Sequence, residues 1–437
     1  MTTSTYLQNT HTGYGSSTGA KATMSVWVKR TDISGDNRST IIGARTDDNN
    51  YFKIRFADND RLMVYGAKSG STNVDIQTNA EFRDVSAWLH LLLQIDTTHA
   101  TEAERVKWYV NGELQTIRTT SRTYPSQNDV NHLTSASDIN IGCNAVGTNE
   151  HFDGLMSHFH LIDGTIYAPT VFGSVDSVTG EWKINTSPSV TYGSKGYFIL
   201  KDGNSLTDAS PNTNHFTLAA GTLTKTEDNP SNVFASINSL LGTDVIGSTV
   251  NFDNGNTVVE DPSGSASGIN PNFISTLGMP SKGKFYCEVQ PSSFSTSSGH
   301  SIGIYRTKGS TDDTGEGELE LNTPKIRYIF ADTSIYIIKY GTNDQTGLTS
   351  ISSGETVGMA LDLDNGTLQY YVNGSARANA ITGINSANDE YDYFFHAGLE
   401  SSSSGRYGKF SWNFGNGAFG STQLTGTTYQ DSNGQGI

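Results

Sequence analysis

The sequence predicts an all-β protein built from two antiparallel β-sandwiches. Apolar residues recur in short alternating runs, turn-forming clusters separate these runs at regular intervals, and helical periodicity is scarce. The composition agrees, with 46 glycines in 437 residues, 35% hydrophobic residues and only 16% charged residues. A half-exposed antiparallel sheet needs apolar side chains on one face only, so this low apolar content is compatible with a folded chain.

The length favours two domains, since a single β-sandwich runs to about 200 residues. We divide the chain into a first sandwich at 1–178, a connector at 179–250 that packs on the sandwiches, and a second sandwich at 251–437. The connector is rich in Ser, Thr, Asn and Asp around one apolar island at Gly196 to Leu200. We expect it to lay one or two strands on a sandwich, with a stiff bend at Asp228-Asn229-Pro230.

The first sandwich opens with the strand Ala22 to Lys29, in which Met24, Val26 and Val28 share one face and Trp27 lies on the other. The further strands expected in this sandwich are 40–44, 51–57, 61–65, 74–78, 88–96, 106–110, 139–142 and 152–162, with one helical turn at 101–105. The strands expected in the second sandwich are 283–289, 301–305, 326–331, 357–364, 367–372, 393–400 and 411–419.

The stretch Val357 to Gly374 predicts a β-hairpin around Asn365-Gly366, because Asn-Gly favours the type I′ turn of a two-residue loop. This register pairs Leu363 with Leu368, Leu361 with Tyr370 and Met359 with Val372, and places Asp362 opposite Gln369. A second Asn-Gly ends the returning strand, and the same ending occurs in Val106 to Gly112. This repeated strand ending suggests that the two sandwiches share one strand arrangement.

The first half resembles the concanavalin A-like, laminin-G-type domain of a family of structural proteins of marine phages and prophages. The matching stretches are MSVWVKRTDISG (24–35), DTTHATEAERVKWYVNGE (96–113), YPSQNDVN (124–131), FDGLMSHFHLIDGTIYAPTVFG (152–173) and TGEWK (179–183). The second half resembles a SPRY domain through its GK-aromatic strand at Gly283, its VG-x-A-L-D strand at Val357 and its final Asn-Phe-Gly strand. It departs from that pattern at Cys287, where a Trp is common. The related phage proteins continue beyond a stretch like QDSNGQGI, so the resemblance implies a chain that extends past Ile437.

The net charge of −16 and the lack of a basic run disfavour nucleic acid and anionic membranes as partners. The amino terminus lacks the features of a signal peptide, and no apolar run reaches the roughly 18 residues of a membrane span. Cys143 and Cys287 lie in different domains within strand-like surroundings, which favours buried free thiols over a disulfide. We expect neither membrane insertion nor a Sec signal.

No catalytic residue is assigned. Concanavalin-like hydrolases place two carboxyl groups across the scissile bond, and their usual E-x-D-x-x-E strand is missing here. Asp362 with Asp364 and Glu318 with Glu320 lie two residues apart on strand faces, where a solvated outer surface is the ordinary interpretation.

No cofactor is expected, and the metal ligands are left open. His158 and His160 share a strand face near His151, yet no further zinc ligand accompanies them, so we interpret them as surface or partly buried histidines. Asp153-Gly154 lies where laminin-G-like relatives sometimes bind calcium; we interpret it as a turn former, with a structural calcium site as the alternative.

The resemblance implies a non-enzymatic virion protein, such as a tail-fibre or other appendage component on the particle exterior. Its lectin-like domains would bind a host surface glycan or receptor, and its partners would include other virion proteins and further copies of itself. Long polar loops at 292–299, 307–322 and 401–405 are candidate contact regions. The alternatives are a capsid decoration protein with purely structural contacts and a glycoside hydrolase of concanavalin-like fold.

Overall fold

The computed structural model describes thirteen stretches of the chain. They are 5–11, 19–33, 38–120, 122–135, 137–201, 205–240, 250–261, 272–296, 299–307, 325–332, 334–384, 392–399 and 407–415. The chain divides into two compact units, Met1–Val233 and Phe234–Ile437. This division falls inside the predicted connector at 179–250.

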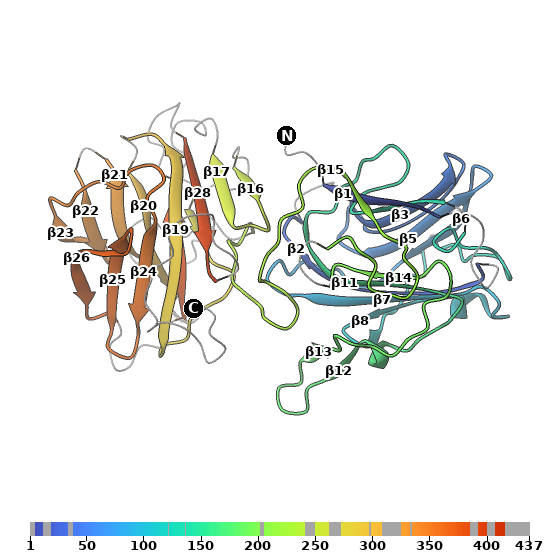
Figure 1. The fold of residues 1–437 in the computed structure, drawn as a ribbon. Coiled ribbons are helices and arrows are strands. Elements are labelled where there is room, and N and C mark those ends of the chain that lie inside the picture. Colours follow the sequence, from blue (N-terminus) through green and yellow to red (C-terminus); the bar gives the residue numbers. More distant parts are fainter. Residues whose placement is uncertain are drawn as a thin grey trace. The chain divides into compact units, whose positions relative to one another are not determined.

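The first unit is a sandwich of a seven-stranded and a six-stranded antiparallel sheet, and most of its strands are labelled in Figure 1. The larger sheet has the order β15 (Thr217–Ala220), β1 (Tyr6–His11), β10 (Ser137–Ile141), β3 (Ser39–Asp47), β4 (Asn50–Phe56), β5 (Leu62–Lys68), β6 (Ser71–Gln77). The smaller sheet has the order β14 (Tyr197–Ile199), β11 (Gly154–Asp163), β2 (Lys21–Arg30), β7 (Leu89–Asp96), β8 (Val106–Val110), β9 (Glu113–Leu114). A separate hairpin of β12 (Gly173–Val175) and β13 (Trp182–Ile184) completes the unit.

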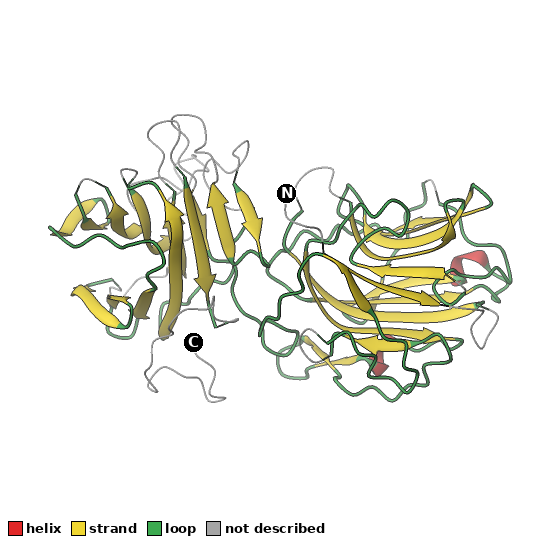
Figure 2. Ribbon diagram, turned by 45° about the horizontal axis from the view of Figure 1, so that its top comes forward, coloured by secondary structure: helices red, strands yellow, loops and turns green. Residues whose placement is uncertain are grey.

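The facing sides of these sheets form one apolar core. On β2 the predicted alternation is confirmed, because Met24, Val26 and Val28 lie in the core while Trp27 stacks on His90 on the opposite face. The predicted helical turn is also present, as the 3-10 helix η1 (Glu102–Glu104). A second short 3-10 helix, η2 (Pro169–Val171), precedes β12, and Figure 2 shows how little helix the described chain contains.

Three strands of the predicted connector lie in the first unit. β13 pairs with β12, β14 extends the smaller sheet beside β11, and β15 extends the larger sheet beside β1. The predicted bend at Asp228 is anchored, because its carboxylate accepts hydrogen bonds from Lys29 Nζ and Trp88 Nε1, both at 2.8 Å. Lys29 and Asp228 are both almost completely buried, so this ion pair fastens the segment to the sandwich.

The second unit is again a sandwich of a seven-stranded and a six-stranded antiparallel sheet. One sheet has the order β16 (Asn251–Asp253), β17 (Val258–Asp261), β28 (Gly408–Asn413), β19 (Lys284–Phe294), β24 (Val357–Asp362), β25 (Thr367–Val372), β26 (Ser375–Thr382). The other has the order β18 (Asn272–Ile274), β27 (Asp392–Gly398), β20 (His300–Thr307), β21 (Lys325–Ala331), β22 (Tyr336–Lys339), β23 (Thr342–Thr346). Its core is separate from that of the first unit and includes Trp412, Tyr328 and Tyr370.

The predicted hairpin exists, but its predicted register is wrong by two residues. Leu361 pairs with Leu368, Met359 with Tyr370 and Val357 with Val372. The loop therefore spans four residues, and Asp362 lies opposite Thr367, not Gln369.

The physical reason for this shift lies in the turn. The Asp362 carboxylate accepts hydrogen bonds from the backbone N–H and the side-chain amide of Asn365, at 3.0 and 2.8 Å, which stabilises a wider turn. Only Gly366 of that Asn-Gly pair has a positive φ, so the expected type I′ turn is not formed there. Because the shift is even, the same side chains still face the core.

The two predicted free thiols are confirmed, since Cys143 and Cys287 are both buried and unbridged. No helix within the described residues is long and apolar enough to cross a membrane.

Candidate functional site

The outward side chains of β3 to β6 form the most chemically varied partly exposed surface in the first unit. We call this surface the β3–β6 face. Strand pairing aligns Gly43, Lys53, Tyr65 and Asp75 in one row across the four strands. A neighbouring row consists of Arg55, Met63 and Gln77. Their neighbours in sequence, such as Ile54, Val64 and Ile76, point the other way into the core.

The loop of residues 143–150 crosses this sheet over β3 and places Glu150 above β4. Gly43 allows the loop to approach closely, because a Cβ at this position would lie 2.5 Å from Ala145 N. The loop is held by bonds within it, from Asn144 N to Asn149 O at 2.9 Å and from Asn144 Nδ2 to Asn149 Oδ1 at 3.1 Å. Glu150 itself has a φ of 54°, in the left-handed region.

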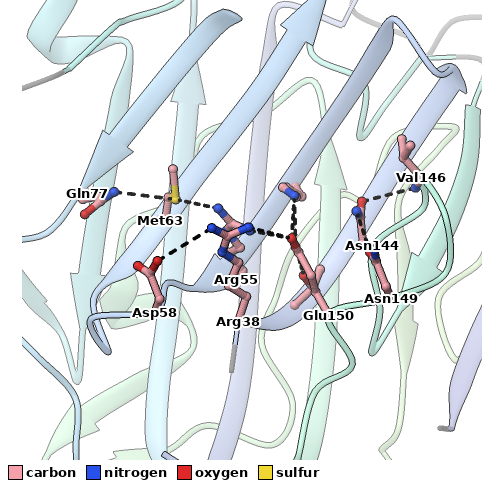
Figure 3. A network of polar contacts seen from close by, with 11 residues as sticks. Arg38, Arg55, Asp58, Met63, Gln77, Asn144, Val146, Asn149 and Glu150 are labelled. Carbon is pink, nitrogen blue, oxygen red and sulfur yellow. Dashed lines mark hydrogen bonds and ion pairs between the residues drawn. The ribbon is translucent and has the colours of Figure 1, made fainter. Parts of the chain in front are cut away.

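Glu150 is the centre of a network of cations, drawn in Figure 3. Its Oε1 accepts a hydrogen bond from Arg55 Nη1 at 2.8 Å, and its Oε2 accepts one from Lys53 Nζ at 3.0 Å. Thr40 Oγ1 donates to Oε2 at 3.2 Å, and Arg38 Nη1 lies 3.7 Å from Oε1. Three cations therefore share one carboxylate, and Arg38 also reaches Asp58 at 3.7 Å.

Burial and charge together set the protonation of this cluster. Burial works to raise the pKa of Glu150, but Arg55 and Lys53 outweigh it and hold the pKa below its usual range. Burial and the neighbouring Arg55 lower the pKa of Lys53. Lys53 and Arg55 are each only 7% exposed, and Arg55 Nε is buried without a hydrogen-bond partner among the described residues.

The other end of the face carries an acceptor and two aromatic rings. Asp75 Oδ1 is buried without a hydrogen-bond partner among the described residues, and burial raises the pKa of this carboxyl. Tyr51 and Tyr65 are half-buried, with ring centroids 6.1 Å apart, and Lys53 Nζ lies 5.7 Å from the centroid of Tyr65. Gln77 accepts a hydrogen bond from Arg118 at 3.1 Å. The face thus combines donors, acceptors and apolar ring surface.

The outer face of the smaller sheet is different, because the segment 167–198 covers it. His90 is buried there between Trp27 and Trp182, and its Nδ1 accepts a hydrogen bond from Trp182 Nε1 at 3.0 Å. The indole N–H is only a donor, so the neutral tautomer protonated at Nε2 donates to Ser25 Oγ at 2.8 Å. Burial lowers the pKa of His90 to about 3. This layer is packed, whereas the β3–β6 face carries the half-buried Tyr51, Tyr65 and Asp75 beside its buried cations.

The histidines singled out in the sequence do not come together as a metal site. His160 is buried, stacks on Phe198 with ring centroids 3.9 Å apart, and its Nδ1 bonds Tyr192 Oη at 2.8 Å. His158 lies in a β-bulge with a φ of 49°, and His151 Nε2 bonds the carbonyl of Thr148 at 3.0 Å. Among the described residues there is no group of three or more His, Cys, Asp or Glu side chains placed to hold a metal ion.

Local contacts explain the acidic pair Asp362 and Asp364 and the calcium candidate Asp153-Gly154. Asp362 pairs with Lys284 at 3.0 Å, and although burial opposes the shift, its bonds with Asn365 and Lys284 lower its pKa to about 2. Asp364 Oδ1 accepts a hydrogen bond from Gly283 N at 3.0 Å. Gly154 has no room for a Cβ, which would lie 2.2 Å from Lys29 O, so a glycine is required beside Asp153 whether or not an ion binds.

One acidic pair and parts of the predicted contact loops lie outside the described residues. These are Glu318 and Glu320, residues 308–322 and residues 401–405, together with 297–298 of the first loop. The Glu150 cluster, in contrast, was missed by sequence reasoning. A signal was present in YFKIRF (51–56), where Lys53 and Arg55 take the outward positions of a strand with an apolar inner face.

Comparisons with known proteins give one family match and several similar structures. Residues 2–172 match the family model described as the concanavalin A-like lectin/glucanases superfamily. The chain is similar in structure to the SPRY domain of human HERC1, at 17% identity over 37% of this chain and 91% of that one, with a TM-score of 0.29. It is also similar to domains LG4-5 of the mouse laminin alpha1 chain, at 10% identity over 93% and 84% of the two chains, with a TM-score of 0.32. A search of curated protein sequences gives no match.

The described residues form an all-β structure of antiparallel sheets, and the stretch 2–172 matches a concanavalin A-like family model.

Proposed function

We propose that this chain is a non-enzymatic binding protein on the exterior of a phage particle, where it contacts a glycan or receptor on the host surface. The observation that carries the binding role is the β3–β6 face, where the half-buried Tyr65 and Asp75 lie on a rigid sheet with the buried cations Lys53 and Arg55. Binding sites combine a few fixed polar groups with apolar surface, and this face has both.

The state of the carboxylates favours binding over hydrolysis. A hydrolase needs one carboxyl group that donates a proton and a second that attacks the sugar or activates water. Glu150 has both oxygens occupied, Oε1 by Arg55 and Oε2 by Lys53 and Thr40, so neither is free to activate water. Asp75 lies two strands from Lys53, about 10 Å by the usual strand spacing, on the side away from Glu150.

The virion setting rests on the sequence resemblance to phage structural proteins. Many copies on one particle would raise the overall avidity of a weak site through effective concentration. A symmetric homo-oligomer is expected on the same ground. Contacts with other virion proteins would hold the chain on the particle.

The test uses the purified chain in multivalent form on host cells. We expect it to bind the cells, to compete with phage adsorption and to release no reducing sugar from envelope polysaccharide. Sugar release that is lost in Asp75→Asn would assign a hydrolase instead. Absence of cell binding, with the chain located on the capsid lattice by electron microscopy of intact virions, would assign a decoration protein.

A further inference from the structure

We infer that the β3–β6 face is a site for an acidic saccharide, and that Glu150 occupies the position its carboxylate or sulfate group takes when it binds. This inference rests on the proposed binding function and names the class of ligand. The cluster of Arg38, Lys53, Arg55 and Glu150 carries it, and Asp75 with the two tyrosines supports it.

The first step is the charge balance of the cluster. The chain as a whole has a net charge of −16, yet here three cations face one carboxylate within 4 Å. Arg38 is half exposed and also pairs with Asp58, whereas Lys53 and Arg55 are buried and share the carboxylate of Glu150. Burying a cation costs several kcal/mol unless its partners compensate fully, and one carboxylate does not balance two buried cations. Arg55 shows the deficit directly, because its Nε donor is buried and finds no acceptor among the described residues. The two buried cations therefore carry more positive charge than Glu150 balances, and their position favours an anionic group.

The second step is the position of Glu150. Its backbone carbonyl accepts a hydrogen bond from Thr40 N of β3 at 2.8 Å, but its carboxylate belongs to a side chain of the 143–150 loop. The carboxylate can therefore turn away from the cations while this backbone bond and the strand ladder stay in place. Thr148 and Glu150 both have left-handed backbones, with φ of 45° and 54°. Such conformations are held by their surroundings, and in this loop the ion pairs of Glu150 are part of what holds them. A carboxylate or sulfate on the ligand can accept the same bonds from Lys53 and Arg55.

The third step is the surface beside the cations. Tyr65 is the cross-strand neighbour of Lys53, and Tyr51 lies beside it, so two half-buried rings flank the anion position. Aromatic rings provide apolar area for the C–H face of a sugar. Beyond them, Asp75 Oδ1 is a buried acceptor that no described residue uses. The order across the face is thus cations, rings, acceptor.

The experiment measures binding of three probes to the full chain by titration calorimetry. The probes are a trimer of galacturonic acid, a sulfated galactose trimer and a neutral galactose trimer. We expect at least one anionic trimer to bind more tightly than the neutral one, and the two anionic probes distinguish a carboxylate from a sulfate. Arg38→Gln should weaken the anionic trimer by about tenfold and leave the neutral trimer unchanged. Arg38 is half exposed, so this variant should fold.

Glu150→Gln tests whether Glu150 competes with the ligand, through the direction in which the affinity for the anionic trimer changes. If Glu150 competes with the ligand, its removal tightens binding of the anionic trimer, whereas a purely structural Glu150 would leave it equal or weaker. The matched controls are Arg83→Gln and Glu81→Gln, which each break an ion pair elsewhere in the first unit and should not change binding. Unchanged affinity in both Arg38→Gln and Glu150→Gln, or no binding of either anionic trimer, overturns the inference. If this inference fails but the chain still binds host cells, the proposed binding function stands. If the chain also fails to bind host cells, the proposed function fails as well.

Discussion

Asn111 and Asn373 hold the same position in the two sandwiches. Each is the first residue of a two-residue Asn-Gly loop, with φ of 48° and 49°, followed by glycines with φ of 82° and 79°. Each side-chain Oδ1 accepts a hydrogen bond from the backbone N–H at the start of a neighbouring strand, His90 N at 2.8 Å and Thr356 N at 3.0 Å. These are the type I′ turns that Asn-Gly favours, and they join β8 to β9 and β25 to β26.

Replacing Asn373 should therefore cost more than replacing Asn365 in the other Asn-Gly pair. Asn373→Ala removes a hydrogen bond and places alanine at a positive φ, so we expect a loss of about 2 to 4 kcal/mol from the second unit. Asn365 is exposed and has no positive φ, so Asn365→Ala should cost less than about 1 kcal/mol. Urea unfolding of a fragment from residue 234, in which Trp412 is the only tryptophan, measures both by fluorescence. Equal losses would mean that the Asn373 turn contributes nothing special.

The corrected hairpin register gives a second prediction. Leu361 is 1% exposed, so Leu361→Ala should cost about 2 to 5 kcal/mol, while Asp362→Ala, at a partly exposed ion pair, should cost less than about 1 kcal/mol. A double-mutant cycle should show stronger coupling of Leu361 to Leu368 than to Tyr370. The reverse order would restore the register predicted from the sequence.

The Lys29–Asp228 pair predicts where the first unit ends. Asp228→Ala removes one partner of a buried ion pair and an acceptor of Trp88, which should lower the free energy of unfolding by about 3 to 5 kcal/mol. The neighbouring Glu227→Ala breaks only an exposed pair and should cost less than about 1 kcal/mol.

A fragment of residues 1–233 should unfold cooperatively, and one ending at 222 should be less stable by a similar amount to Asp228→Ala. In the second unit, a fragment from 234 should be more stable than one from 251, because Ile237 belongs to that core. If the fragment ending at 233 were no more stable than the one ending at 222, the first unit would end elsewhere. If the fragment from 234 were no more stable than the one from 251, the second unit would begin elsewhere.

Buried neutral histidines predict a loss of stability in mild acid. Burial lowers the pKa of His90 to about 3 and that of His160 well below its usual value, and burial also lowers the pKa of His132. Below about pH 6.5 the unfolded chain binds protons that the folded chain excludes, so stability falls as pH falls, by about 1.4 kcal/mol per pH unit for each such histidine.

Urea unfolding between pH 7 and 5 measures this slope. The carboxylates whose pKa is lowered, such as Glu150 and Asp362, add their loss mainly below about pH 4.5 and so lie outside this window. His90→Gln should make the slope shallower by the share of one histidine. A slope that does not change would show that His90 protonates within the folded protein.

The strand pattern could be predicted from the sequence because alternation depends on neighbours in sequence. Met24, Val26 and Val28 face the core as expected, since period-two patterning directly reflects which side of the strand is buried. The hairpin register could not be predicted, because a hydrogen bond from Asn365 to the Asp362 side chain decides between two turns that bury the same face. Alternation alone does not distinguish registers that differ by two residues.

The Glu150 cluster could not be predicted because its members are distant in sequence. Lys53 and Arg55 are adjacent outward residues of one strand, but Glu150 reaches them from a loop 95 or more residues later in the chain. What brings the loop there is the close approach of Ala145 to Gly43, which no local pattern encodes. His158 and His160 were conspicuous in sequence for the opposite reason, since they lie only two residues apart, yet both pack against Phe198.

The two buried cysteines give each sandwich its own built-in reporter. Burial raises the pKa of Cys143 to about 12 and that of Cys287 well above its usual value, so neither thiol forms the reactive thiolate while its unit is closed. The chain contains no other cysteine. Alkylation of Cys143 therefore times the opening of the first unit and alkylation of Cys287 that of the second, in one unlabelled sample, with mass spectrometry separating the two peptides.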